Sequence, residues 1–311
     1  MRVIALLLMA LLLILTALLF LLVFLLILVL LLFVRVFLFL LFIMKPLYSH
    51  FLYLELCSEA ATVDRIGLRI WYNGGMIEIK NVSKHYGAKK ALDNISFEVN
   101  RGEIFAFIGH NGAGKTTLIK SICGILDFEK GEILINGKSI KNDPIACKKE
   151  MAYIPDDPEL YEDMKAISFI NFVCDMYNTP IEVREKNVTR YAKMFGMENE
   201  LGNTIKSFSH GMKQKVAIIA ALSHEPNVLI MDEPFVGLDP KAIFDMKEVM
   251  HEIVKDGGTI FFSTHILDMA EKLCDRVAIV ENGQIVKVGD MKKIRGDESL
   301  EKVFLELGVK S

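Results

Sequence analysis

The first part of the chain, residues 1–44, is an apolar leader. Residues 3–34 carry no charge, and Thr16 is the one polar residue among them. A straight helix of this length would span about 48 Å, against about 30 Å of bilayer hydrocarbon, so a single span would have to tilt or kink. The run is also far longer than the apolar core of a secretory signal peptide, which argues against a cleaved signal peptide.

The sequence allows two interpretations of the leader. Arg35 interrupts the apolar run and Lys45 follows it, and these cations favour a transmembrane segment whose C-terminal end faces the cytoplasm. Alternatively, residues 1–75 are an upstream extension, because Met76 opens a segment typical of a protein start. In either case residues 45–75 have little pattern and are expected to form a linker.

After the linker, the pattern of apolar and polar residues is typical of a domain with alternating strands and helices. We place this domain at residues 76–290 and expect a helical tail at 291–311. Strands are expected at 77–82, 95–99, 104–108, 133–135, 228–231, 259–262, 277–280 and 284–288. Helices are expected from Lys115 to about Gly124, from Met212 to Leu222 and elsewhere within 160–222. The Asn-Gly pairs at 136–137 and 282–283 predict hairpins, so the fold class is α/β with a parallel core and antiparallel additions.

Charge and cysteine content argue against a nucleic-acid-binding protein and against a disulfide-rich one. The formal net charge is −3, and the sequence shows no basic patch that would bind nucleic acid. The five cysteines are scattered and odd in number, which indicates reduced thiols in the cytosol rather than a disulfide framework. They are Cys57, Cys123, Cys147, Cys174 and Cys274.

The strongest candidate site directly follows the apolar run 104–108. It has the spacing GxxxxGK[ST] between a predicted strand and a predicted helix, as a phosphate-binding P-loop requires. Backbone N–H groups of its glycines would surround phosphate oxygens, Lys115 would reach the β- and γ-phosphates of a nucleotide, and Thr116 would offer a hydroxyl to Mg²⁺. The motif consists of Gly109, His110, Asn111, Gly112, Ala113, Gly114, Lys115, Thr116 and Thr117.

A second element places two carboxylates at the end of a buried strand. Residues 228–231 are apolar and lead directly into Asp232 and Glu233. The first carboxylate could hold Mg²⁺ and the second could orient the attacking water, since phosphoryl transfer depends on positioning and charge neutralisation. A strand ending in two acids is common by itself, but after a P-loop it is typical of a Walker B strand.

With these two motifs, residues 76–288 resemble the ATP-binding cassette of ABC transporters. That resemblance implies a P-loop NTPase fold with a parallel core sheet, an antiparallel β subdomain and a helical subdomain, and it implies ATP and Mg²⁺ as cofactors. It further implies that Glu233 is the catalytic base or water-orienting residue and that His265 senses the γ-phosphate. Tyr86 matches the aromatic residue that stacks on adenine, and Asp232 matches the metal ligand.

Two further segments of the family, the signature at 208–212 and the Q-loop at 153–158, match less closely. Ser209 and Gly211 match the signature, where they would contact the γ-phosphate bound by a second cassette. His210 stands where the family has glycine, and it requires a backbone that tolerates a Cβ. Asp156 stands where the Q-loop has glutamine, and we expect it near Mg²⁺, to which it would bring a negative charge. Residues 159–164 resemble the branch that serves drug, antibiotic and sodium efflux permeases.

The leading hypothesis is an ATPase subunit that powers a membrane transporter, with export favoured. Each ATP site of the family combines the P-loop of one cassette with the signature of another, so a second cassette is the expected partner, in a homodimer or a heterodimer. The membrane permease is expected in a separate chain, which places the cassette at the cytoplasmic face of the cell membrane, and the leader would add an anchor if it spans the bilayer.

The alternative is a soluble ABC ATPase that acts on ribosomes or DNA. The single cassette and the short interval between Lys115 and Ser209 disfavour it.

Overall fold

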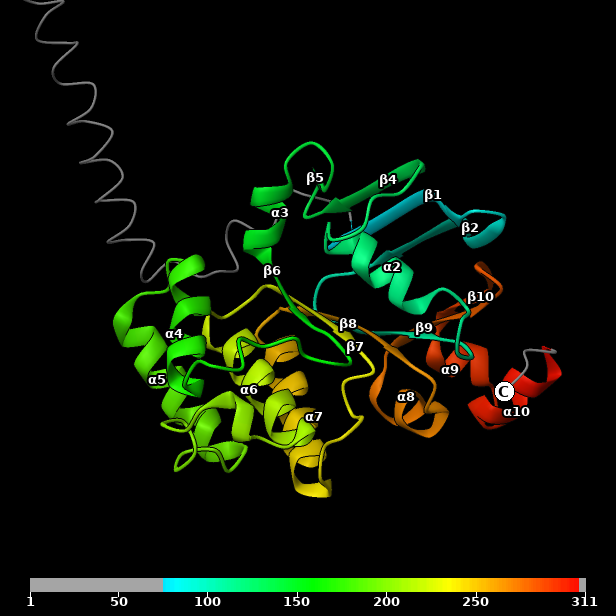
Figure 1. The fold of residues 1–311 in the computed structure, drawn as a ribbon. Coiled ribbons are helices and arrows are strands. Elements are labelled where there is room, and N and C mark those ends of the chain that lie inside the picture. Colours follow the sequence, from blue (N-terminus) through cyan, green and yellow to red (C-terminus); the bar gives the residue numbers. More distant parts are fainter. Residues whose placement is uncertain (1–74, 308–311) are drawn as a thin grey trace, which may run out of the picture. The chain divides into compact units, whose positions relative to one another are not determined.

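The computed structural model describes residues 75–307 (Figure 1). The chain divides into a unit Met1–Trp71 and a unit Tyr72–Ser311, and the fold described below belongs to the second unit. The expected leader at 1–44 and all but the last residue of the expected linker at 45–75 lie outside the described residues. Within 75–307, no helix combines the length and the apolar character that a bilayer span needs.

The strands form two sheets. The larger has the order β10-β9-β3-β8-β7-β6, with parallel neighbours except for β10 beside β9, and the smaller is antiparallel with the order β2-β1-β4-β5. The strands are β1 (Ile77–Tyr86), β2 (Lys89–Val99), β3 (Ile104–Ile108), β4 (Lys130–Ile135), β5 (Lys138–Ser139), β6 (Met151–Ile154), β7 (Val228–Asp232), β8 (Thr259–Thr264), β9 (Arg276–Glu281) and β10 (Gln284–Asp290). The hairpins predicted at 136–137 and 282–283 join β4 to β5 and β9 to β10. The predicted parallel core with antiparallel additions is confirmed.

Along the chain, the described helices lie after β3, between β5 and β6, between β6 and β7, and after β7. They are α2 (Lys115–Ile122), α3 (Pro144–Glu150), α4 (Ala166–Met176), α5 (Ile181–Met194), the short 3₁₀ helix η2 (Ile205–Ser207), α6 (His210–Ser223), α7 (Pro240–Lys255), α8 (Leu267–Leu273), α9 (Met291–Arg295) and α10 (Leu300–Glu306). The last two helices belong to the expected helical tail, of which residues 308–311 are not described.

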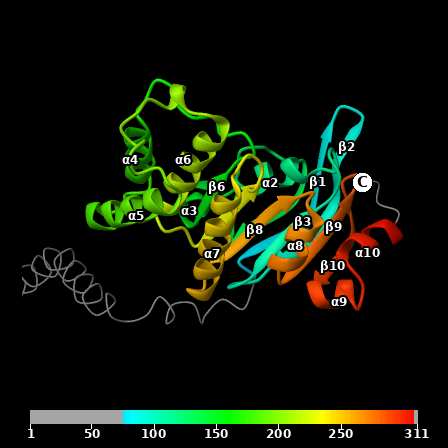
Figure 2. The same ribbon diagram turned by 90° about the horizontal axis from the view of Figure 1, so that it is seen from below.

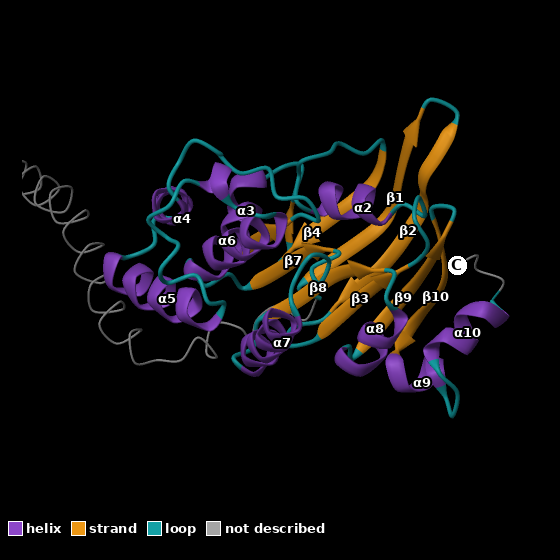
Figure 3. Cartoon of the chain, turned by 60° about the horizontal axis from the view of Figure 1, so that its bottom comes forward, coloured by secondary structure: helices purple, strands orange, loops and turns teal. Residues whose placement is uncertain are grey.

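The large sheet lies between two layers. The small sheet and α2 cover one of its faces, and α7, α8 and α9 cover the other (Figures 1 and 3). Helices α4, α5 and α6 form a separate group beside the β6 edge, as the view from below also shows (Figure 2). This arrangement leaves the loop between β3 and α2 at the carboxyl edge of the parallel strands, where α/β folds commonly bind ligands.

Burial on both faces explains why the parallel strand β3 is wholly apolar. In β3, Ile104, Ala106 and Ile108 pack into the core on the side of the long helices, whereas Phe105 and Phe107 pack into the core shared with α2 and the small sheet. Successive side chains of a strand point to opposite faces, so a strand between two cores needs an apolar residue at every position. The interpretation of 104–108 as a buried strand is therefore confirmed.

Several elements differ in their bounds from the expectation, and β2 and α6 are two of them. The strand expected at 95–99 begins at Lys89, because its backbone pairing with β1 continues through polar positions that the apolar pattern does not mark. The helix expected from Met212 begins at His210 instead. Ser209 caps it, since its Oγ accepts a hydrogen bond from the N–H of Met212 at 3.3 Å.

A chain that begins at Tyr72 is expected to fold and to bind ATP. The small-sheet core contains Met76, whose N–H donates to the carbonyl oxygen of Val99 at 2.7 Å, and every described core residue follows it. Thermal unfolding followed by circular dichroism should show one cooperative transition that ATP with Mg²⁺ moves to higher temperature, because a ligand that binds the native state stabilises it. A truncated protein without such a transition would mean that preceding residues belong to the fold.

Candidate nucleotide-binding site

The P-loop joins β3 to α2 and is shaped by close backbone approaches. Gly114 precedes the helix with a φ of 109°, in a region that side chains disfavour, and a Cβ there would lie 2.4 Å from the carbonyl oxygen of Ala91. Only glycine fits this position. The glycine lets the chain turn directly from the buried strand into α2, whose first residue is Lys115.

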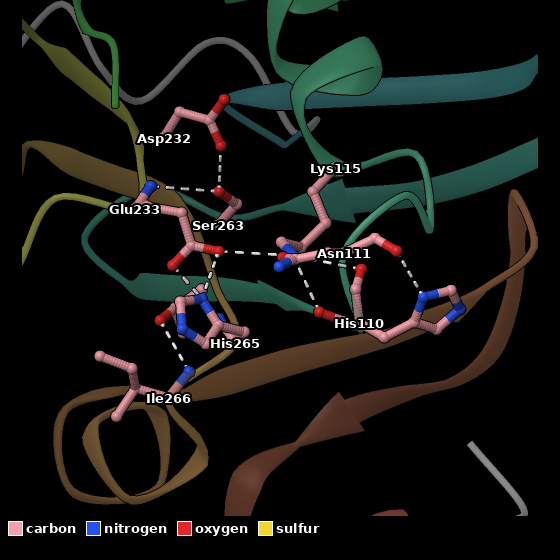
Figure 4. Close-up of polar contacts among 10 residues, drawn as sticks. His110, Asn111, Lys115, Asp232, Glu233, Ser263, His265 and Ile266 are labelled. Atoms are coloured by element: carbon pink, nitrogen blue, oxygen red, sulfur yellow. Dashed lines mark hydrogen bonds and ion pairs between the residues drawn. The ribbon is translucent and has the colours of Figure 1, made fainter. Parts of the chain in front are cut away.

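Lys115 is a buried cation held by the loop and by the neighbouring strand end. It is 6% exposed, and its Nζ donates to the carbonyl oxygens of Gly109 at 2.8 Å and of His110 at 3.3 Å (Figure 4). The same Nζ lies 3.3 Å from Oε1 of Glu233. A buried ammonium needs such partners, and the contact joins the two motifs that the sequence predicted separately.

The two carboxylates at the end of β7 are positioned by β8, the adjacent parallel strand. Asp232 is 2% exposed and accepts a hydrogen bond from Oγ of Ser263, its register partner. Glu233 has a φ of 47°, which is uncommon for a residue with a side chain. Its N–H donates to Ser263, with the carbonyl oxygen at 3.2 Å and Oγ at 3.3 Å.

His265 completes the arrangement from the end of β8. Its Nδ1 lies 3.0 Å from Oε1 of Glu233, and its backbone N–H donates to Oε2 of the same carboxylate at 3.3 Å. Glu233 thus contacts Lys115 on one side and His265 on the other (Figure 4). The sequence placed these three groups in one site, and the structure brings them together.

One pocket gathers most of the predicted binding residues. It is lined by Tyr86, Asn111, Gly112, Gly114, Lys115, Thr116, Thr117, Asp156, Asp232 and Glu233. Lys89 and Ala91 also line it. The sequence did not predict these two, because their position depends on how the β1–β2 hairpin packs beside the P-loop. Gly109 and His110 contribute the carbonyl groups that hold Lys115 and are not among the lining residues.

The oxygen ligands of the pocket fit Mg²⁺ bound together with a nucleotide. Thr116, Asp156 and Asp232 line it with hard oxygen atoms, and Mg²⁺ commonly takes one or two carboxylates and completes its shell with water and phosphate oxygens. No group of three or more His, Cys, Asp or Glu side chains within 75–307 has the geometry of a metal cage. The pKa of Asp156 is raised, first by its partial burial and then by the negative charges of Asp232 and Glu233.

The signature residues lie apart from this pocket. Ser209 and Gly211 are at the N-terminus of α6 and are not among the lining residues. A Cβ on Gly211 would lie 2.6 Å from the carbonyl oxygen of Gly237, so glycine is required there for the loop before α7 to approach.

His210 fits the signature without backbone strain. It has a helical conformation as the first residue of α6, so the local backbone tolerates its Cβ. Its ring packs against Gly237, where an added Cβ would lie 2.8 Å from Cδ2 of the imidazole. Its Nδ1 lies 3.5 Å from Oδ1 of Asp157, so the side chain contacts both the Q-loop segment and the loop before α7.

The fold and this pocket define a P-loop nucleotide-binding protein, and comparisons with known proteins identify its family. The model of the ABC transporter family matches residues 92–236. The ABC-type transporter ATP-binding protein EcsA of Bacillus subtilis is 38% identical over 237 residues, which cover 75% of this chain and 96% of EcsA. The linearmycin resistance ATP-binding protein LnrL of the same organism is 33% identical over 214 residues, which cover 69% of each chain.

A solved structure agrees with these sequence relatives. The structure of an ATP-binding subunit of an ABC transporter superposes with a TM-score of 0.72 and 38% sequence identity, covering 75% of this chain and 99% of that one. The chain belongs to the ABC transporter family as an ATP-binding subunit and is an ATPase of that family. The alternative of a soluble ABC ATPase that acts on ribosomes or DNA finds no support among these relatives.

Proposed function

We propose that the domain at residues 76–290 is the ATP-hydrolysing subunit of a membrane exporter and works at the cytoplasmic face of the cell membrane. The observation that carries this proposal is that Lys115, Asp232 and Glu233 line one pocket at the carboxyl ends of the parallel strands. Lys115 and His265 both contact Glu233 there. Phosphoryl transfer needs a cation for the phosphates, an acceptor that orients water and a ligand for Mg²⁺. This pocket offers all three.

ATP would lie with its base against Tyr86 and its phosphates in the P-loop. Tyr86 is 51% exposed, so adenine can stack on its ring without displacing a packed side chain. The N-terminus of α2 begins at Lys115 in the pocket and favours the negative charge of the phosphates. Thr116, Asp232 and Asp156 would hold Mg²⁺, which when bound neutralises charge on the β- and γ-phosphates.

Glu233 would orient the attacking water and accept its proton. When phosphate oxygens replace Glu233 as partners of Nζ of Lys115, the carboxylate of Glu233 keeps its contact with His265 and becomes available to a water molecule. His265 keeps the carboxylate in place through its Nδ1 and its backbone N–H, and its ring would meet the γ-phosphate from beside Glu233. Positioning and charge, rather than a covalent step, carry the reaction.

A second cassette would complete each site. Ser209 and Gly211 begin α6 outside the pocket of their own chain, so they can serve only a phosphate that another cassette presents. The N-terminus of a helix with a serine hydroxyl is suited to bind such an anion. We therefore propose a dimer of cassettes, either of two copies of this chain or with a related one.

Export through a permease in a separate chain is the direction we propose. Residues 159–164 resemble the efflux branch, and the relative LnrL carries the name of a resistance protein.

Affinity purification of the full chain in detergent should recover a membrane protein with many spans, and recovery of ribosomes instead would support the alternative function. Cells that produce only the Glu233→Gln protein should retain more of a hydrophobic dye than wild-type cells, whereas equal retention would argue against export of such compounds.

Ser209 can be tested for its two separate contacts. Ser209→Ala removes both the helix cap and the hydroxyl offered to the partner's phosphate, so we expect a loss of about 1 kcal/mol in stability. We also expect an ATPase rate about 10- to 100-fold lower, from the loss of one hydrogen bond to a charged group. Steady-state phosphate release and thermal unfolding measure the two effects.

Ser209→Asp separates the two contacts. Aspartate is a good N-cap residue, so this variant should keep the wild-type stability. Its negative charge would repel the partner's γ-phosphate, so its ATPase activity should fall below that of Ser209→Ala. An active Ser209→Asp protein would show that the hydroxyl does not face a phosphate.

A further inference from the structure

A second lysine, Lys89, reaches the nucleotide pocket from the small sheet. It is the first residue of β2 and the register partner of Tyr86 across the β1–β2 hairpin. Its Nζ lies 4.0 Å from the position that a Cβ on Gly112 would take, so its ammonium stands beside the P-loop. Lys89 and Lys115 therefore line one pocket but come from different elements, the start of β2 and the start of α2.

The charge pairing of the hairpin distinguishes Lys89 from its neighbours. Nζ of Lys84 lies 3.3 Å from Glu129, and Nζ of Lys90 lies 3.1 Å from Asp93. Among residues 75–307, no carboxylate forms an ion pair with Lys89. An ammonium that lines a pocket for a polyphosphate, with no counter-ion from the protein, is available to an anion of the ligand.

We propose that Lys89 binds the α- or β-phosphate of the nucleotide. The inference rests on the proposed function and adds a binding residue to it. In the nucleotide position proposed above, Tyr86 lies at the base end of the pocket, and Asp232 and Glu233 lie at the γ-phosphate end. Lys89 pairs with Tyr86 across the hairpin and stands beside Gly112, so it meets the phosphates nearest the base.

This position predicts a particular kinetic effect. A group that binds phosphates common to ATP and ADP contributes equally to both complexes and to the transition state of hydrolysis. Such uniform binding changes KM and leaves kcat unaltered. Lys89 is therefore a binding residue and not a catalytic one.

The test is a calorimetric titration of the full chain with ADP and with a non-hydrolysable ATP analogue. Lys89→Ala should weaken the binding of both ligands by the same factor, about 1.5- to fivefold, as for an exposed ion pair. Lys89→Arg should keep most of the affinity. Lys90→Ala removes the same charge one residue away, from a lysine that pairs with Asp93 and does not line the pocket, and should bind as the wild type does.

Three outcomes would overturn the proposal. The first is that Lys89→Ala binds like Lys90→Ala, and the second is that it loses affinity for the ATP analogue alone together with a fall in kcat. The third is that its loss of affinity persists unchanged at high salt. The last outcome would indicate a structural effect, because added salt screens an exposed charge contact. If the wild-type chain binds neither ligand, the proposed function fails. If the wild type binds both and Lys89→Ala matches it, only the assignment of Lys89 fails.

Discussion

Glu233→Gln is expected to bind ATP tightly and to hydrolyse it about 10²- to 10⁴-fold more slowly than the wild type, the usual contribution of a general base. Glutamine keeps the size of the side chain but cannot accept the proton of the attacking water. It also removes the negative charge that lies 3.3 Å from Nζ of Lys115 in the resting site, so Lys115 is freer to bind phosphate. ATP affinity should therefore stay the same or rise.

The slow turnover of Glu233→Gln should also reveal the dimer. With hydrolysis blocked, two cassettes should remain joined through ATP, and gel filtration with ATP and Mg²⁺ should show a doubled mass. Single-turnover phosphate release measures the chemical step. Glu248→Gln makes the same change at an exposed position of α7 and should behave as the wild type does. A Glu233→Gln protein that stays monomeric and hydrolyses ATP at the wild-type rate would remove both its catalytic role and the dimer model.

The sequence predicted those parts of the site that lie on one continuous segment. The P-loop carries its own glycines, its lysine and the strand and helix on either side, so a local pattern defines all of it. The same holds for Asp232 and Glu233, which follow a strand that must be apolar because both of its faces are buried. Such segments can be found without knowing how the chain folds over long distances.

The parts that the sequence missed depend on contacts between strands distant in the chain. Ser263 supports Asp232 only because β7 and β8 pair in a register that sets these two residues side by side. Lys89 reaches the pocket only because the β1–β2 hairpin lies against the P-loop. No spacing in the sequence encodes either contact, since both arise from sheet packing.

The start of α6 is an intermediate case, because the sequence contains a local N-cap residue that the prediction of the helix start did not take into account. Ser209 is a favoured N-cap residue, and placing the helix from its cap would have put the first helical residue at His210. It would also have shown that a Cβ at this position meets no steric limit of the backbone. The departure of His210 from the family's glycine changes what the signature touches, namely Asp157 and Gly237, rather than how the backbone is bent.

Lys115→Ala is expected to weaken ATP binding by about 10- to 150-fold, from the loss of one strong hydrogen bond to a charged group, and to leave no measurable ATPase activity. Lys115 is 6% exposed and is the cation in contact with Glu233 on the P-loop side. Its removal also leaves that buried carboxylate with its contact to His265 but without its ammonium partner, so the protein should be less stable than the wild type. Calorimetric titration and thermal unfolding measure the two losses separately.

The double variant Lys115→Ala/Glu233→Gln distinguishes a binding defect from a folding defect. Removing the unpaired charge should restore much of the stability that Lys115→Ala loses, because the penalty comes from a buried carboxylate without its partner. Nucleotide affinity should stay low, since the phosphates still lack their cation. Lys120→Ala, at an exposed position of the same helix, should retain wild-type affinity. If the double variant recovered both its stability and its affinity, Lys115 would be a structural partner of Glu233 and not the ligand of the phosphates.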